Sequence, residues 1–118
     1  MKDAEKVKAR YVRDPLPRRL GGLAADLARI ASSARHAAGA DSVALMLEES
    51  QHFIEWTAGE AAPDVAEELC EIQLMLALWR RGWPETQASP SLRAVLSLLA
   101  LKWSDQVLAH SGLLADAS

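Results

Sequence analysis

The middle of this chain, from residue 36 to residue 79, has no lysine or arginine. Apart from histidine, every ionisable side chain that is charged there is a carboxylate. Nine carboxylates fall in those 44 positions. The first 19 residues are biased the other way: this arm carries a net charge of +4, and the other 99 residues carry −7. The total of −3 weighs against nucleic-acid binding, which needs a net basic face. The separation of charge favours association with a protein surface or a second copy.

Cysteines and long apolar segments are also scarce. The single Cys70 excludes an intramolecular disulfide and fits a reducing compartment. Uninterrupted apolar runs such as 74–79, the longest, and 98–101 fall far short of the roughly 18 residues of a membrane span. No apolar region follows the basic residues at the start, as one would in a secretory signal. We therefore expect a cytoplasmic protein that does not enter a membrane.

The sequence lacks the patterns that mark common enzyme sites. It has no glycine-rich phosphate loop and no nucleophile elbow. The pattern Glu-x-x-His occurs once, from Glu49 to His52, whereas di-iron carboxylate bundles need two such motifs and two further glutamates. We therefore expect no catalytic residue, no cofactor and no bound metal. Two alternative hypotheses remain: a metal-dependent or redox helical-bundle enzyme that uses Glu49 and His52, and a nucleic-acid accessory protein that uses the basic arm.

Leucine and alanine dominate the composition, which favours helices. Glycines and prolines divide the chain into periodic segments, with Asp41 and Ser89 as candidate N-caps. These signals predict helices over about 16–38, 42–58, 63–81 and 90–111, and a short extra helix is an option for the arm, at about 2–12. The predicted fold is an all-α antiparallel bundle with short loops and four helices, or five if the arm is helical. The predicted organisation is a basic arm (1–15), a bundle domain (16–112) and a flexible tail (113–118).

Each of the last three predicted helices has a second apolar stripe opposite its core face. Burying one such side chain contributes roughly 1.5–3 kcal/mol, so a homodimer is the simplest way to cover these stripes. The motif Trp79–Trp83 adds residue types that are enriched in interface hot spots. We therefore expect a protein that acts by association, with itself or with another protein that has a basic surface. The candidate interface residues are Leu45, Trp56, Leu74, Leu78, Arg80, Arg81, Trp83, Leu98 and Leu101.

Three segments carry a resemblance to known proteins. They are Phe53–Ala58, Glu68–Leu69 and Leu76–Trp79, the last followed by Trp83. In these segments the chain resembles small all-helical proteins of unknown function from cyanobacteria, and the similarity would cover most of residues 18–112. It implies a cytosolic helical protein and transfers no catalytic or binding residue.

Overall fold

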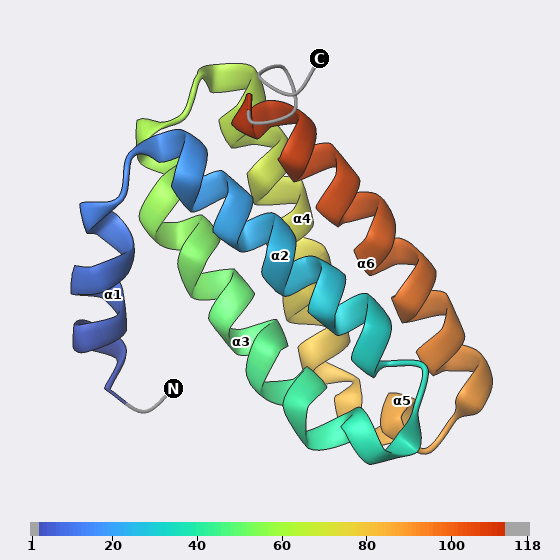
Figure 1. Cartoon of the computed structure of the whole chain (residues 1–118). Coiled ribbons are helices and arrows are strands. Elements are labelled where there is room, and N and C mark those ends of the chain that lie inside the picture. The colour runs from blue at the N-terminus through green and yellow to red at the C-terminus, as the bar shows by residue number, and fades with distance from the viewer. Residues whose placement is uncertain (1–2, 113–118) are drawn as a thin grey trace.

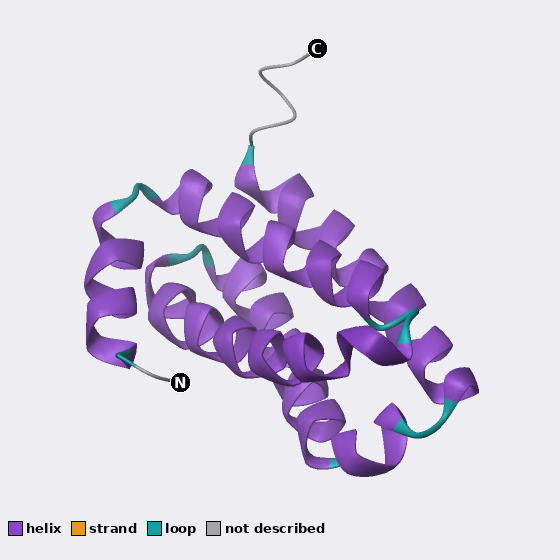
Figure 2. Ribbon diagram, turned by 60° about the horizontal axis from the view of Figure 1, so that its bottom comes forward, coloured by secondary structure: helices purple, strands orange, loops and turns teal. Residues whose placement is uncertain are grey.

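The computed structural model describes residues 3–112, and every regular element in that range is helical (Figures 1 and 2). The predicted all-α class is confirmed. The described residues contain no helix that is both long and apolar enough to cross a membrane. The predicted tail 113–118 lies outside the described range. The α-helices are α1 (Ala4–Arg13), α2 (Leu16–Ser33), α3 (Ala40–Thr57), α4 (Pro63–Arg81), α5 (Trp83–Gln87) and α6 (Pro90–Ser111), with single 3₁₀ turns η1 (Ala37–Gly39) and η2 (Ala58–Glu60).

The helix count differs from the prediction of four or five. The arm forms α1, and a sixth α-helix, α5, lies where the sequence predicted a loop between Gly82 and Pro90. Pro84 lies at the start of α5, where a missing N–H is tolerated, so the proline that was expected to stop one helix also helps to begin the next.

Helices α2, α3, α4 and α6 form the bundle, and successive members run in opposite directions (Figure 1). Helix α2 packs against α6 and α3, and α3 packs against α4. Helix α1 lies outside this bundle against α3, and α5 closes the end between α4 and α6. The largest fully buried side chains come from all four bundle helices and include Leu23, Leu27, Ile30, Leu47, Ile54, Leu69, Leu76, Leu96 and Val107.

Small side chains on α2 and α6 allow the two helices to pack closely against each other. The hydroxyl of Ser97 donates a hydrogen bond to the carbonyl oxygen of Ala31 at 2.6 Å, and the hydroxyl of Ser104 donates to that of Ala24 at 2.7 Å. The two serines are seven residues apart, as are the two alanines, so the same contact repeats after two helical turns. These paired contacts, which we call the α2–α6 seam, fix how the two helices are aligned.

The ends of α6 are as the sequence predicted. The Ser89 hydroxyl accepts a hydrogen bond from the Leu92 amide at 3.3 Å, and Pro90 occupies the first turn. Gly112 ends the helix with φ 78°, in the left-handed region that glycine adopts most easily.

The junction between α2 and α3 differs from the prediction. Helix α2 ends at Ser33 rather than near residue 38, and a short turn with η1 follows. Gly39 is the N-cap residue of α3, so Asp41 lies in the first turn and is not the cap that we expected. A Cβ atom on Gly39 would lie 2.4 Å from the carbonyl oxygen of Ser33. The close return of the chain past the end of α2 therefore requires glycine here.

Helix α1 is held on the bundle by one aromatic side chain. The ring of Tyr11 stacks on that of Phe53, with centroids 4.1 Å apart and planes 4° from parallel. Its hydroxyl donates to the carbonyl oxygen of Arg19 at 2.9 Å and accepts from the hydroxyl of Thr57 at 3.1 Å. Burial raises the pKa of Tyr11 to about 12, although the hydrogen bond with Thr57 opposes the rise. None of the ten residues of α1 is fully buried, so Tyr11 is the main anchor.

Candidate functional site

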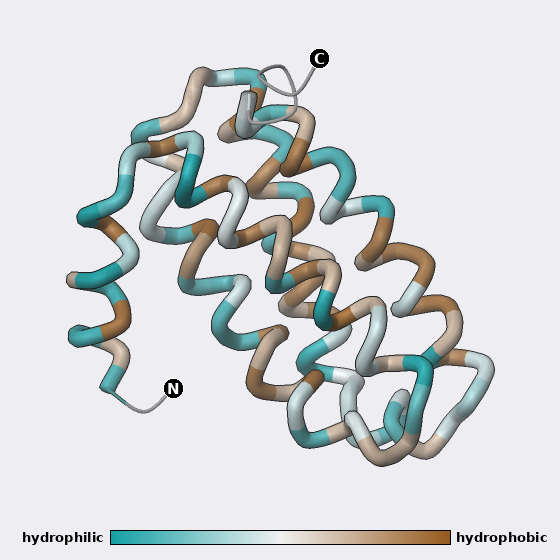
Figure 3. The backbone as a smooth tube through the Cα atoms, in the orientation of Figure 1, coloured by the Kyte–Doolittle hydropathy of each residue, from teal (hydrophilic) through white to brown (hydrophobic). Residues whose placement is uncertain are grey.

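Exposed apolar side chains recur along the second half of α4 and along residues 92–101 of α6. Eight large apolar side chains are exposed among the described residues, and six of them belong to these two segments. Figure 3 shows hydrophobic positions recurring along α6, whereas α1 is mainly hydrophilic. We call these six residues together the apolar face: they are Leu74, Leu78, Leu92, Val95, Leu98 and Leu101.

The antiparallel alignment of α4 and α6 brings these residues to one end of the bundle. Near the other end, His110 of α6 contacts Glu68 of α4, with 2.5 Å between Nε2 and Oε2. The second half of α4 therefore lies level with the first half of α6, so the six residues occupy the same half of the bundle. On α6 their three-residue spacing turns successive side chains around the helix, and Leu92 and Leu101 point to opposite sides of it. A concentration of exposed large apolar residues is unusual on a monomer and marks a candidate interaction surface.

A groove of about 430 Å³ lies between the other halves of the same helices. One wall carries four carboxylates from the first three turns of α4, and the opposite wall carries Lys102 and Gln106 of α6. Ile72, Met75 and Trp103 add apolar atoms to the lining. We call this feature the acidic groove, and its carboxylates are Asp64, Glu67, Glu68 and Glu71.

The structure separates the candidate interface residues into two groups. Leu74, Leu78, Leu98 and Leu101 are exposed and belong to the apolar face, and Arg81 is exposed at the end of α4. Leu45 is 66% exposed but lies on α3. Trp83, by contrast, is only 6% exposed and belongs to the core. It is not available to a partner in this conformation.

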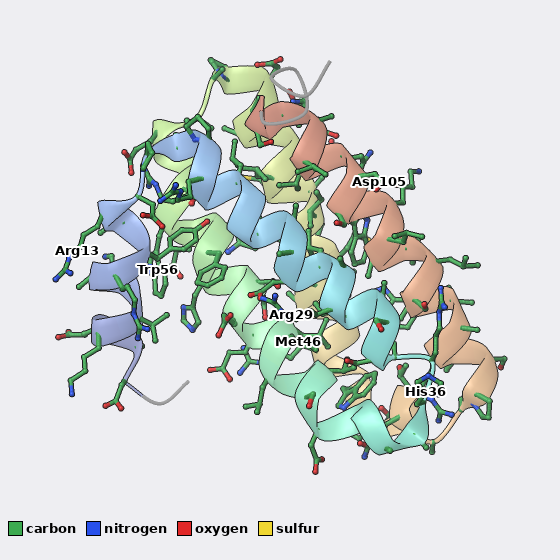
Figure 4. The ribbon with its side chains drawn as sticks, viewed as in Figure 1. Arg13, Arg29, His36, Met46, Trp56 and Asp105 are labelled. Atoms are coloured by element: carbon green, nitrogen blue, oxygen red, sulfur yellow. The ribbon has the colours of Figure 1, made fainter. Side chains whose placement is uncertain are left out.

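Two further candidates make contacts within the chain. Trp56 lies on the side of α3 that faces α1 (Figure 4), near the rings of Tyr11 and His52. Arg80 links α4 to α3, since its guanidinium lies 3.7 Å from the Glu48 carboxylate and donates to the Gln51 side chain at 3.4 Å. Trp56 and Arg80 therefore stabilise the packing around α3.

The residues of the alternative enzyme hypothesis do not form a joint site. His52 lies between Glu48 and Glu55, at 3.9 and 3.6 Å, and its ring stacks on Trp56. Glu49 instead neighbours the Asp26 carboxyl of α2. Within residues 3–112, no three histidine, cysteine, aspartate or glutamate side chains come together as metal ligands would.

Asp26 is a buried carboxyl that the sequence analysis did not single out. It is 1% exposed and forms an ion pair with Arg29 of the next turn. Burial raises the pKa of Asp26 to about 7, and hydrogen bonding and repulsion from the neighbouring Glu49 carboxyl add to the rise. A signal was present in the sequence, because Asp26 falls three residues after Leu23 and four before Ile30 on the core face.

Other missed features are Tyr11 and part of the apolar face. Tyr11 follows Val7 by four residues, a spacing that gives the basic arm one apolar edge. Helical projection places Leu92 and Val95 on the core face, but they lie at its margin and are 41% and 46% exposed.

Comparison with known proteins gave no relative: no family model, curated protein or solved structure matches this chain. The resemblance to small helical proteins from cyanobacteria stays a prediction. Functional inference therefore rests on the surfaces described above.

Proposed function

We propose that this protein acts by protein–protein association and that its first partner is a second copy, bound through the apolar face. The observation that carries the proposal is that six of the eight exposed large apolar side chains of the described residues lie on α4 and α6, in the same half of the bundle. Full burial of one such side chain contributes roughly 1.5–3 kcal/mol, so water is a poor environment for six of them together.

A second copy suits this face for two reasons. Closed two-fold association is the commonest oligomeric arrangement, and it brings the same patch of both copies together. The apolar face can meet itself without placing like charges opposite one another, because the four carboxylates of the acidic groove lie toward the other end of α4. A stable specific interface of this kind buries on the order of 1,200 Å² or more in total.

The test is sedimentation equilibrium on the full chain and three variants. Leu98→Glu and Leu74→Glu each place an unpaired charge in the interface, so both variants should sediment as monomers of 12.8 kDa at about 500 mM salt, where contacts between exposed charges are screened. Leu45→Glu is the matched control, because Leu45 is as exposed as Leu98, at 66% against 70%, but lies on α3. It should remain a dimer.

Circular dichroism of each variant establishes that the helices are retained, since all three positions are exposed. A wild-type chain that is monomeric at concentrations on the order of 10–100 μM would overturn the proposal, because standard-size interfaces bind more tightly than that. An equal loss of association in all three variants would show that the apolar face has no special role.

A further inference from the structure

A stripe of basic side chains without ion-pair partners runs along α1, from its outer side to the edge where Arg10 borders a pocket with Asp14 and Glu49. Lys6, Arg10 and Arg13 follow one another at intervals of four and three residues, and all three are exposed. None of them forms an ion pair or a side-chain hydrogen bond with another described residue. Figure 4 shows Arg13 projecting away from the bundle. These residues, which we call the basic stripe, are available to an acidic partner.

The acidic groove carries a stripe of carboxylates with matching spacing. Asp64, Glu67 and Glu71 follow one another at intervals of three and four residues and are exposed. Within the described range no basic group pairs with them, whereas Glu68 is occupied by His110. In each stripe the outermost residues are seven positions apart, which is about 10 Å along a helix.

The spacings coincide in one orientation only. When α1 runs antiparallel to α4, the intervals of the basic stripe, taken from Arg13 back to Lys6, become three and four residues. Arg13 then lies opposite Asp64, Arg10 opposite Glu67 and Lys6 opposite Glu71. In the parallel orientation the middle charge of one stripe falls one residue out of step with that of the other.

Helix α1 cannot reach the groove of its own chain. Tyr11 anchors it to Phe53 and Thr57 of α3, and only Asp14 and Pro15 connect it to α2. In Figures 1 and 2, α1 and α6 lie on opposite sides of the bundle, and α6 forms one wall of the groove. Contact between the two stripes therefore requires two molecules.

We propose that the basic stripe of one molecule docks antiparallel into the acidic groove of another. The contact joins two different surfaces, so it builds a ring or an open chain of molecules according to the rotation between neighbours, and it uses residues other than those of the apolar face. A second copy is a better partner than nucleic acid. The net charge of −3 opposes phosphate, whereas the groove offers three carboxylates at the required spacing.

Three exposed ion pairs give weak association that depends on salt. Each exposed pair contributes little on its own, and charges are screened beyond roughly 10 Å at 0.1 M salt. The contact should therefore form at low ionic strength and at high protein concentration. The dimer through the apolar face should persist in high salt, because it depends on the burial of apolar surface.

Charge reversal on both sides provides the test, with Leu98→Glu in every chain to remove the apolar dimer. The arm variant carries Lys6→Glu and Arg10→Glu, and the groove variant carries Glu67→Lys and Glu71→Lys. By sedimentation velocity, the parent should self-associate at about 50 mM salt, and its dissociation constant should rise at least ~10-fold at about 500 mM. Each reversed variant alone should be monomeric, and an equimolar mixture should associate again, because opposite charges then meet.

The matched control is Glu85→Lys with Asp105→Lys, which makes the same change in net charge at exposed positions outside the groove. If this control restores association with the arm variant as well as the groove variant does, the attraction is general and the proposal fails. It also fails if the mixture stays monomeric or if the parent does not self-associate at low salt. Binding of anionic vesicles or RNA that is lost only in the arm variant, with self-association unchanged, would assign the basic stripe to a different partner.

Discussion

Ser104 of α6 donates its hydroxyl hydrogen to the main-chain carbonyl oxygen of Ala24 in α2, at 2.7 Å, and both residues are buried. Helix α6 thus contacts the backbone of α2 directly, and larger side chains would keep the helices apart. The equivalent bond from Ser97 to Ala31 repeats the contact two turns away.

The first prediction concerns this seam. Ser104→Ala removes one buried hydrogen bond and should lower the free energy of unfolding by about 1 kcal/mol. Ser104→Leu also forces the helices apart and should cost about 1–3 kcal/mol more. Urea denaturation followed by circular dichroism measures both, with the exposed Ser91→Ala on the same helix as control. Equal stability of Ser104→Leu and the wild type would show that the seam is not tightly packed.

The second prediction concerns the anchor of α1. Tyr11→Ala removes the stacked ring and both hydrogen bonds, so α1 should detach and become a substrate for trypsin. Tyr11→Phe keeps the ring and should have a smaller effect. Stacking and hydrogen bonding are each worth about 1 kcal/mol, so cleavage after Arg10 and Arg13 should accelerate about tenfold or more in the alanine variant. Cleavage after Lys102 in α6 is the internal control and should not change.

The third prediction concerns pH. Asp26 has an ordinary pKa of 3.8 in the unfolded chain and about 7 in the folded protein, because it is buried beside Glu49. Between these values the folded state holds a proton that the unfolded state has lost, so the free energy of unfolding falls as the pH rises from about 4 to about 7. Asp26→Asn removes this loss and should be more stable than the wild type at pH 8, by at least about 1 kcal/mol.

Thermal unfolding of both chains from pH 4 to pH 8 measures the Asp26 effect. Arg29→Gln is an informative companion, because it removes the ion pair that favours the ionised carboxylate, raises the pKa of Asp26 further and should extend the fall in stability to higher pH. If the melting temperatures of the wild type and of Asp26→Asn vary with pH in the same way across this range, Asp26 does not hold a proton in the folded state.

The fourth prediction uses the only cysteine as a reporter of the proposed dimer. Cys70 is exposed on α4, one turn before Leu74 on the same side of the helix. A long, flexible bismaleimide should therefore join two wild-type chains covalently. The cross-link should be lost in Leu98→Glu, retained in Leu45→Glu and absent from Cys70→Ser. Cross-linking of Leu98→Glu at the wild-type rate would indicate random collision.

The bundle helices were predictable because their signals are local. Capping by Ser89, proline at the first turn and glycine after the last turn act within a few residues of each helix end, and they fixed the bounds of α4 and α6. The end of α2 was missed because it depends on a tertiary approach, that of Gly39 to Ser33, which periodicity does not record.

The surfaces were less predictable than the helices. Exposure of Leu74 and Leu98 followed from helical projection, because those positions lie opposite a fully apolar face. The burial of Trp83 did not, since it depends on the fold of α5, a five-residue helix with little signal of its own. The acidic groove is formed by two helices from different parts of the chain. The run of carboxylates in the sequence therefore predicted an acidic surface, but it did not predict a groove.

The α2–α6 seam also constrains when this protein can fold during synthesis. Its two hydrogen bonds join residues that are 66 and 80 positions apart, and α6 is the last described helix to leave the ribosome. Helix α2 therefore emerges before α3 and α4, and it cannot pack against α6 until those helices have been synthesised. Closing contacts between distant residues is slow relative to forming local helices. The bundle should consequently close only after α6 has emerged.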